Sequence, residues 1–390
     1  MQETTFPVEI LIHDDASTDN TAEIVREYER KHPRLIKPIY QVENQYSKGN
    51  KPGRLNRERA IGNFIAVCEG DDHWTCPTKL QRQIDAMIEA HDAVACFHAT
   101  SITHDGGGSV VEDSRLFDQD TKIGSVATAD LIQRNCLGAC TCSALVRAEV
   151  YRDPKFRHFA GLAMGDWPAW LIASLRGRLL YINEVMAVYN RHSGGVWTGM
   201  SVAGQQYTSA EFVARLPEVL SHQHRAAISS SLGRCYGRLL LSDYCSVTAS
   251  KARILIRRNQ SLLSRDFFDK FAMEHFSHFK RTGRLQEEHG LIEMIESLHA
   301  NLCVLRSWDI LVPHETHLTK RLRFMFWHDC WQKHVADQNP RDATRCMFHV
   351  WMLRPLNVIM FVNLVLCMLG PPGLRVRSWC ASALRSASAH

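Results

Sequence analysis

The amino-acid sequence predicts an α/β fold with a mostly parallel sheet, followed by a mainly helical C-terminal region. Two observations carry this prediction. In the first half of the chain, short apolar runs alternate with segments whose apolar residues recur at helical spacing, which is typical of parallel strands joined by helices. From about residue 210 onward, long stretches have helical spacing and few strand signals, at 233–241, 252–263 and 290–305.

Composition limits the class of protein. The chain has 390 residues, enough for two or three domains. Hydrophobic residues make up 45% and charged residues 22%, so we exclude a disordered, collagenous or coiled-coil chain. The net charge of +5, from 46 basic and 41 acidic residues, is too balanced to predict a nucleic-acid partner. The 13 cysteines lack the dense spacing of secreted disulfide frameworks, and polar residues follow Met1, so we expect a cytoplasmic location.

The first predicted unit is a strand, a loop and a helix. Residues 8–12 form a short apolar run that ends in Asp14 and Asp15. Capping residues follow at 17–20, and they precede a helix whose apolar residues share one face, Ile24, Val25 and Tyr28. A second strand is predicted at residues 35–42.

A second unit repeats this order. A strand is predicted at residues 63–68, and it again ends in carboxylates, at residues 69–72. Pro77 lies in the first turn of a predicted helix, because proline needs no amide partner there. The next strand is predicted at residues 93–97 and a glycine-rich turn at 104–109. Since ligands of such sheets bind at the carboxyl ends of strands, both acidic strand ends are candidate binding sites.

The strongest local signal for chemistry is the cluster of Glu69, Asp71 and Asp72. Three carboxylates within four residues repel one another unless a cation lies among them. Hard oxygen ligands favour Mg²⁺ or Mn²⁺, and such an ion would hold a diphosphate. The alternative is a solvated acidic turn.

A second signal is the run that contains Asp14, Asp15 and Ser17. A carboxylate at a strand end can accept a hydrogen bond from a base N–H or a ribose hydroxyl, while the Ser and Thr residues of the run close the loop and cap the helix. Capping without ligand binding is the alternative. With the other acidic cluster at the same sheet edge, this run favours a nucleotide site.

Two later motifs complete the candidate site. Asp166 precedes a predicted helix with Pro168 in its first turn, and the helix N-terminus favours the ionised carboxylate that could accept a proton from a hydroxyl. Its alternative role is a simple helix cap. In the segment 189–197, Arg191 could meet a phosphate and His192 could ligate a metal, or both could be structural.

In this order, the four motifs resemble those of bacterial family 2 glycosyltransferases of the glycosyltransferase A fold. The resemblance covers about residues 3–199 and implies a Rossmann-like, mostly parallel sheet. It also implies an inverting enzyme with a nucleotide-sugar donor, usually UDP-linked, a divalent metal ion, and a saccharide or glycolipid acceptor. We therefore expect a glycosyltransferase domain at 1–205, a helical region at 206–345 and an apolar, basic tail at 346–390.

The resemblance also assigns roles to residues. It makes Asp15, with Asp14, the contact to the nucleotide base. It makes Glu69 and Asp71 the ends of a D-x-D-like metal motif, with Asp72 beside them. Asp166 falls at the position of the catalytic base, and Gly165 precedes it where many members have an acidic residue. His192 falls where many members place a histidine that reaches the metal.

One departure from the family leaves alternatives open. Family members usually begin with a strand and a helix, whereas residues 1–4 resemble the end of that helix. We therefore expect the opening strand to be missing, which would expose an inner strand edge with unpaired backbone groups. The alternatives to an active glycosyltransferase are a truncated, inactive remnant that binds at most a partner, and a metal-dependent nucleotidyltransferase.

The tail contains a run of uncharged, mostly apolar residues at 356–369, with Arg354 before it and Arg375 and Arg377 after it. The run is shorter than the roughly 20 residues that span a bilayer. We expect it either to pack as a core helix or to rest on anionic lipid headgroups, in which case the enzyme is peripheral at the cytoplasmic face of the inner membrane.

Overall fold

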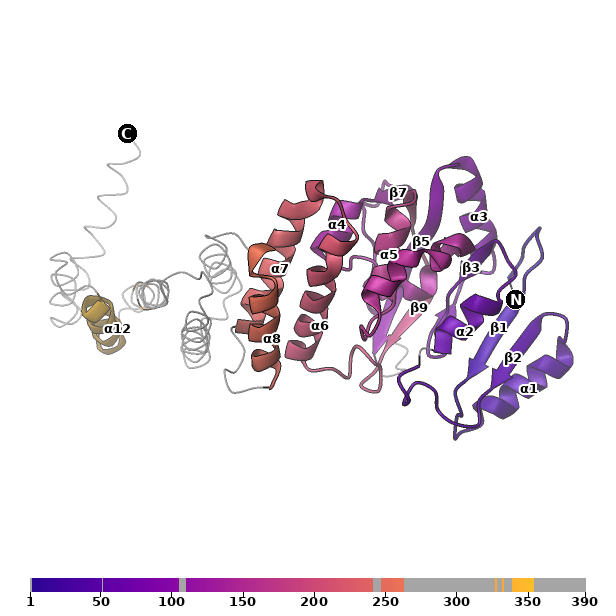
Figure 1. The fold of residues 1–390 in the computed structure, drawn as a ribbon, viewed down its shortest axis with the longest axis horizontal. Helices are drawn as coiled ribbons and strands as arrows, with labels where there is room; N and C mark the ends of the chain where they lie inside the picture. Colours follow the sequence, from indigo (N-terminus) through magenta and orange to yellow (C-terminus); the bar gives the residue numbers. More distant parts are fainter. Residues whose placement is uncertain are drawn as a thin grey trace. The chain divides into compact units, whose positions relative to one another are not determined.

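The computed structural model describes residues 2–50, 52–104, 110–240, 247–262, 327, 332 and 339–353 (Figure 1). The chain divides into two compact units, the first formed by residues 1–201 and 215–228, and the second by 202–214 and 229–390. The predicted apolar run at 356–369 and its flanking arginines lie outside the described residues. The expected domain boundaries at residues 205 and 345 stay predictions.

The first unit begins with a small parallel sheet. Strand β1 (Ile10–Asp14) pairs with β2 (Ile36–Tyr40), from Ile10 opposite Ile36 to Asp14 opposite Tyr40. Helix α1 (Thr21–Lys31) connects them, as the sequence predicted, although Val25 is the buried member of its predicted apolar face. Its other two members, Ile24 and Tyr28, are exposed.

A larger sheet of seven strands follows. Its path is β3-β8-β5-β9-β4, with β6 paired to β5 and β7 paired to β9. The strands are β3 (Phe64–Ala66), β4 (His73–Trp74), β5 (Ala93–His104), β6 (Val110–Asp113), β7 (Ile123–Val126), β8 (Leu145–Arg147) and β9 (Arg178–Arg191).

The α/β class is confirmed, but the sheet is mixed instead of mostly parallel. Within the larger sheet, β5 and β9 are parallel, and the other described pairs are antiparallel. Strand β6 follows β5 after only residues 105–109, which are too few for a parallel crossover. Alternating strand and helix signals do not reveal such short antiparallel connections. The sequence therefore predicted more parallel strand pairs than the sheet contains.

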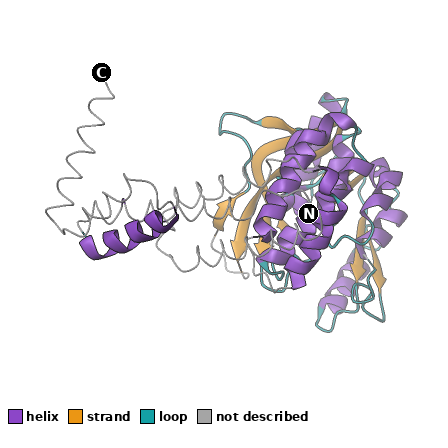
Figure 2. Cartoon of the chain, turned by 60° about the vertical axis from the view of Figure 1, so that its left-hand side comes forward, coloured by secondary structure: helices purple, strands orange, loops and turns teal. Residues whose placement is uncertain are grey.

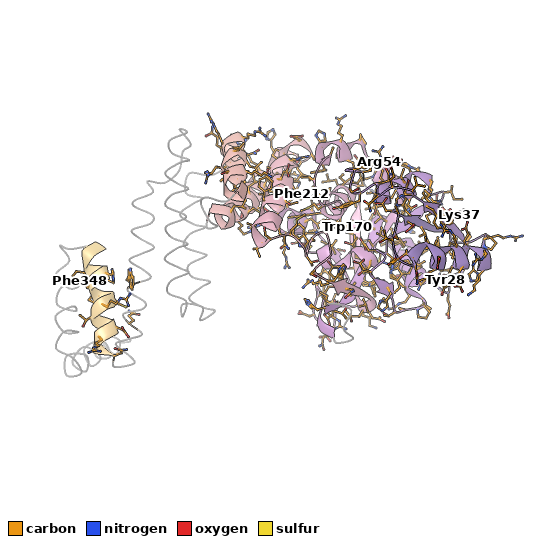
Figure 3. All side chains as sticks on the ribbon, turned by 90° about the horizontal axis from the view of Figure 1, so that it is seen from below. Tyr28, Lys37, Arg54, Trp170, Phe212 and Phe348 are labelled. Atoms are coloured by element: carbon orange, nitrogen blue, oxygen red, sulfur yellow. The ribbon has the colours of Figure 1, made fainter. Side chains whose placement is uncertain are left out.

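Helix α3 (Lys79–Glu89) covers one face of this sheet and α5 (Asp166–Ser174) the other, and α4 (Thr128–Gln133) packs against α5. Helix α2 (Pro52–Arg59) instead packs on β1 of the small sheet, where the Asn56 amide donates to the carbonyl oxygen of Leu11 at 3.0 Å. Short 3₁₀ turns lie at Gly138–Ser143, Ala148–Arg152 and Pro154–Phe159. Apolar residues of α3 pack in one cluster with Cys96 of β5. The next residue, Phe97, points to the opposite face, where its ring meets Trp170 of α5 edge to face with the ring centroids 4.8 Å apart. Figure 3 shows Trp170 inside the molecule and Lys37 and Arg54 at its margin.

The described parts of the second unit are helical, as predicted (Figure 2). Helices α6 (Val202–Arg215), α7 (Arg225–Leu240) and α8 (Val247–Arg258) are joined in part by 3₁₀ turns, and α12 spans Pro340–Leu353. Phe212, Leu232 and Ile256 are fully buried. None of the helices in the described ranges has both the length and the apolar character that a bilayer crossing requires.

A buried histidine lies at the centre of the sheet. His98 of β5 is fully buried, and its Nδ1 donates a hydrogen bond to the carbonyl oxygen of Ala99 at 2.7 Å. Its Nε2 is buried and has no hydrogen-bond partner among the described residues. Burial lowers the pKa of His98 to about 3, and the positive charges of Lys79 and Arg82 contribute to this shift. The imidazole is therefore neutral in the folded protein at neutral pH.

The lowered pKa of His98 predicts that acidic pH destabilises the first unit. Below the ordinary pKa of about 6.5, the unfolded chain gains a proton at His98 that the folded chain does not bind, so stability falls as the pH drops from there toward about 3. The loss from this group is at most about 1.4 kcal/mol per pH unit. Urea unfolding of His98→Asn, which keeps an N–H donor near Ala99, should show a weaker pH dependence than the parent chain. Exposed His91→Asn is the control, and equal slopes for the parent and His98→Asn would refute the prediction.

Candidate functional site

The acidic turn, which we define as residues 69–72, connects β3 to β4. The backbone N–H of Asp72 donates to the carbonyl oxygen of Glu69 at 3.2 Å and closes the turn. Asp72 is buried, and its Oδ1 accepts a hydrogen bond from the backbone N–H of Asn190, near the end of β9, at 2.9 Å. The other oxygen, Oδ2, is buried without a hydrogen bond in the described structure. The turn is thereby fixed to the end of the central strand β9.

Negative charge accumulates in this turn. Although Glu69 is exposed as a residue, desolvation of its carboxyl group by the surrounding protein raises its pKa to about 7. The charges of Asp72, Asp71 and Asp166 add to the shift, which places Asp166 near the acidic turn. Burial also raises the pKa of Asp72. Within the described ranges, no three metal-binding side chains are gathered into a preformed metal site. The hard, crowded carboxylate oxygens nevertheless fit a divalent cation.

The end of β9 brings the last predicted motif to the acidic turn. His192 follows β9 directly, and its Nε2 lies 2.9 Å from Oδ2 of Asp71. The guanidinium of Arg191 lies over the ring of Tyr189, 5.9 Å from its centroid. Asp71, Asp72 and His192, the three predicted metal ligands, therefore share one region of the structure.

Asp166 is the first residue of α5, and Gly165 is the N-cap. The carboxylate lies at the helix start, as the sequence predicted, but one position inside the helix. Its Oδ2 accepts a hydrogen bond from Nδ2 of Asn135 at 2.7 Å. The indole N–H of the next residue, Trp167, donates to the carbonyl oxygen of Leu131 at 2.7 Å. Both bonds join the start of α5 to α4 and the turn after it.

Two further residues lie near both acidic groups, and the sequence analysis missed them. The guanidinium of Arg57, from α2, lies 5.1 Å from the ring centroid of Tyr151. Burial raises the pKa of Tyr151 to about 12, and the charges of Glu69 and Asp166 act in the same direction. The available signal for Arg57 was a basic run in α2, which precedes β3 and the acidic turn in the sequence. Nothing in the sequence marked Tyr151.

Asp14 and Asp15 contact β2 and the loop that follows it. The side chain of Asp14 is buried, and its Oδ1 has no hydrogen-bond partner within the described ranges. The two carboxylate oxygens of Asp15 accept the backbone N–H groups of Gln45 and Tyr46 at 2.8 and 2.9 Å. Ala16 follows with a φ of +62°, a left-handed conformation that turns the chain sharply behind the two aspartates. Asp15 keeps free lone pairs for a ligand, because a carboxylate has about four acceptor positions.

Ser17 is exposed at the start of this loop. The residue that accepts a hydrogen bond at the start of α1 is Asp19, whose Oδ1 receives the backbone N–H of Thr21 at 3.0 Å. Asp19 lies within the run of capping residues predicted at 17–20, and Asn20 is the N-cap residue of α1. A nucleotide contact of Ser17 stays a prediction.

The mixed sheet, the acidic turn after β3 and the aspartate that begins α5 define an α/β domain with its charged residues at strand ends and helix starts. The comparison with protein families makes this class specific, because residues 1–153 match the model described as glycosyl transferase family 2. This part of the chain matches a glycosyltransferase family 2 domain, and it contains the first two of the four motifs, whereas Asp166 and the segment 189–197 lie beyond it.

Several bacterial proteins are similar to the chain. Uncharacterized protein Rv1520 of Mycobacterium tuberculosis is 31% identical over 237 residues, which cover 58% of this chain and 64% of that protein. Uncharacterized glycosyltransferase alr2836 of Nostoc is 26% identical over 49% of this chain and 58% of its own. Putative teichuronic acid biosynthesis glycosyltransferase TuaG of Bacillus subtilis is 27% identical over 46% of this chain and 66% of its own. The chain thus matches less than two thirds of the length of these relatives.

The contacts of Asp15 predict that it orders the loop after β2. Asp15→Ala removes two hydrogen bonds to a charged acceptor, each of which contributes about 1.5–3 kcal/mol. We expect hydrogen exchange at the amides of Gln45 and Tyr46 to accelerate by at least about tenfold, since this factor corresponds to about 1.4 kcal/mol. Asp19→Ala, which removes a similar bond in the loop between β1 and α1, should leave these amides unchanged. Unchanged exchange in Asp15→Ala would contradict the prediction.

Proposed function

We propose that this chain is an inverting glycosyltransferase that moves a sugar from a nucleotide-sugar donor, a UDP-sugar, to a hydroxyl group of a saccharide or glycolipid acceptor. The observation that carries the proposal is that the charge of Asp166, at the start of α5, acts on Glu69 of the acidic turn, which lies in the region that matches family 2. The carboxylates of the acidic turn suit the diphosphate side of such a reaction, and the carboxylate of Asp166 suits the acceptor side.

On the donor side, Asp71, Asp72 and His192 would hold Mn²⁺ or Mg²⁺, with Glu69 beside them. When bound, such an ion offsets the negative charge of the departing diphosphate. Arg191 supplies a fixed positive charge in the same region. The carboxylates of Asp14 and Asp15, with Ser17, would contact the nucleotide.

Arg57 adds a second cation on the donor side. Burial lowers its pKa, yet a guanidinium stays charged at neutral pH. Its location beside Tyr151, and hence near Glu69 and Asp166, supports a contact to a donor phosphate.

On the acceptor side, Asp166 would accept the proton of the attacking hydroxyl group. The acceptor oxygen forms a bond to the anomeric carbon while the bond from that carbon to the diphosphate oxygen breaks, and the electron pair leaves with the nucleoside diphosphate. Attack on the face opposite the leaving group inverts the anomeric centre. The N-terminus of α5 stabilises the ionised form of Asp166 that this step needs.

The name of the TuaG relative, a putative teichuronic acid biosynthesis glycosyltransferase, supports a saccharide acceptor. Two other functions give different products. A nucleotidyltransferase would release pyrophosphate from a nucleoside triphosphate, and an inactive remnant would release nothing. Incubation of the chain with UDP-sugars, candidate saccharides and Mn²⁺ should release UDP, whereas pyrophosphate from nucleoside triphosphates would favour the first rival.

The base assignment predicts the effect of one substitution. Asp166→Asn keeps the size of the side chain but removes its basicity, so turnover should fall by about 10²-fold or more, the usual scale for a general base. Donor binding, measured by calorimetry with UDP, should be retained. Asp130→Asn, at the start of the neighbouring helix α4, is the matched control and should stay active. Full activity of Asp166→Asn would refute the assignment.

The metal assignment predicts that chelation abolishes transfer. EDTA should stop UDP release and added Mn²⁺ should restore it. Asp71→Asn should raise the Mn²⁺ concentration for half-maximal activity by at least about tenfold, because a neutral amide oxygen replaces a charged ligand. Asp113→Asn changes a surface carboxylate paired with Arg115 and serves as the control. Transfer that is insensitive to EDTA would contradict the metal assignment.

A further inference from the structure

We propose that Asn135 is a positioning residue for Asp166, and that Gly138 leaves room for the Asn135 side chain. The inference rests on the proposed function, in which Asp166 is the base. It assigns a role to the turn after α4, which none of the four sequence motifs includes.

The first observation is the contact itself. Nδ2 of Asn135 donates to Oδ2 of Asp166 at 2.7 Å, a short hydrogen bond to an acceptor that is charged when it acts as a base. The two residues are 31 positions apart, so the bond joins two separate segments. The bond from Trp167 to the carbonyl oxygen of fully buried Leu131 holds the same two segments together.

The second observation is the orientation of the Asn135 carboxamide. Its Oδ1 is buried and has no hydrogen-bond partner in the described part of the chain. Leaving a buried acceptor unsatisfied is unfavourable by about 1–3 kcal/mol. The reversed amide would instead place Oδ1 against the Asp166 carboxylate at the same distance. The orientation therefore directs the amide N–H toward the charge of Asp166 and leaves the amide oxygen without a partner.

The third observation is the space at Gly138. A Cβ atom at this position would lie 3.0 Å from Nδ2 and 3.2 Å from Cγ of Asn135. The backbone N–H of Gly138 also donates to the carbonyl oxygen of Asn135 at 3.2 Å, which closes the turn around the side chain. A side chain at position 138 would displace the carboxamide by a few tenths of an ångström from its place against Asp166, so glycine favours the close approach.

These contacts have a chemical consequence. A donor fixed on Oδ2 determines which lone pairs of the carboxylate face the reacting hydroxyl group, and it stabilises the ionised form. Among the described residues, Glu69 of the acidic turn and Tyr151 interact electrostatically with Asp166, and Arg57 lies beside Tyr151. Loss of the amide donor should therefore raise the pKa of Asp166 and loosen its orientation, while the donor site stays intact.

Three substitutions test this role through turnover. Asn135→Ala should lower kcat by about tenfold, change the KM for the donor by less than about threefold, and move the acidic limb of the pH profile to higher pH. Asn135→Asp places a second carboxylate beside the first and should move this limb further. Gly138→Ala should shift it in the same direction, although it leaves Asn135 in place.

Asn183→Ala is the matched control. The Asn183 amide donates to the carbonyl oxygens of Phe117 and Asp118 at 3.0 Å, and its Oδ1 is likewise buried without a partner among the residues described. This substitution should reduce stability in urea unfolding as much as Asn135→Ala does, but it should leave the pH profile unchanged.

A readout that needs no turnover separates this inference from the proposed function. Carboxyl ¹³C NMR of the full chain, with the Asp166 signal identified by its loss in Asp166→Asn, should titrate at higher pH in Asn135→Ala and Gly138→Ala. Unshifted titrations and unshifted pH profiles in both variants would overturn the role of Asn135. Full activity of Asp166→Asn would instead overturn the base assignment, whatever the Asn135 variants do.

Discussion

The parallel pairing of β5 and β9 is the constraint on which the candidate site depends. The two strands stay paired from Ala93 opposite Arg178 to His104 opposite Arg191, and this long ladder forms the centre of the larger sheet. Since parallel strands end at the same edge, the pairing carries the end of β9 to the place where Asn190 binds Asp72 and His192 meets Asp71. Helix α5, which begins with Asp166, packs through Trp170 on Phe97 of the same β5 strand. The paired strands β5 and β9 therefore position both the acidic turn on the donor side and Asp166 on the acceptor side.

A buried polar network lies beneath the acidic turn. The ammonium of fully buried Lys79 lies 4.1 Å from the ring centroid of Trp74 and donates to Gln83 at 2.9 Å. The Gln83 amide in turn donates to the carbonyl oxygens of Cys96 and Ser143 at 2.7 and 2.8 Å. Burial lowers the pKa of Lys79 to about 7. Because unsatisfied buried groups are unfavourable, these bonds favour one arrangement of β4, α3 and β5. This network stabilises the segment next to the acidic turn, although the carboxylates of the turn repel one another.

Most of the first hundred residues could be predicted from sequence, because strand and helix periods alternate there and each strand ends in polar residues. Strands β4 and β6 to β9 were missed. Short antiparallel strands carry weak periodicity and depend on contacts far along the chain. In the candidate site, sequence motifs mark Asp166 and His192, and their roles stay predictions. Asn135, which acts through a contact to a residue 31 positions away, has no local signature. The loop contacts of Asp15 were likewise invisible, because the backbone of a loop accepts almost any sequence.

The turn at Gly138–Ser143 shows why the two sides of the site are linked. At its first residue, it accommodates the carboxamide that binds Asp166. Near its other end, the carbonyl oxygen of Cys142 accepts the indole N–H of Trp74 at 2.7 Å, two residues after Asp72. The same short segment therefore contacts the residue that holds the candidate base and the strand that follows the acidic turn. Since a packed turn moves as a unit, a change in either contact is transmitted to the other. The separation between base and carboxylates is thus set by this turn as well as by the central strands.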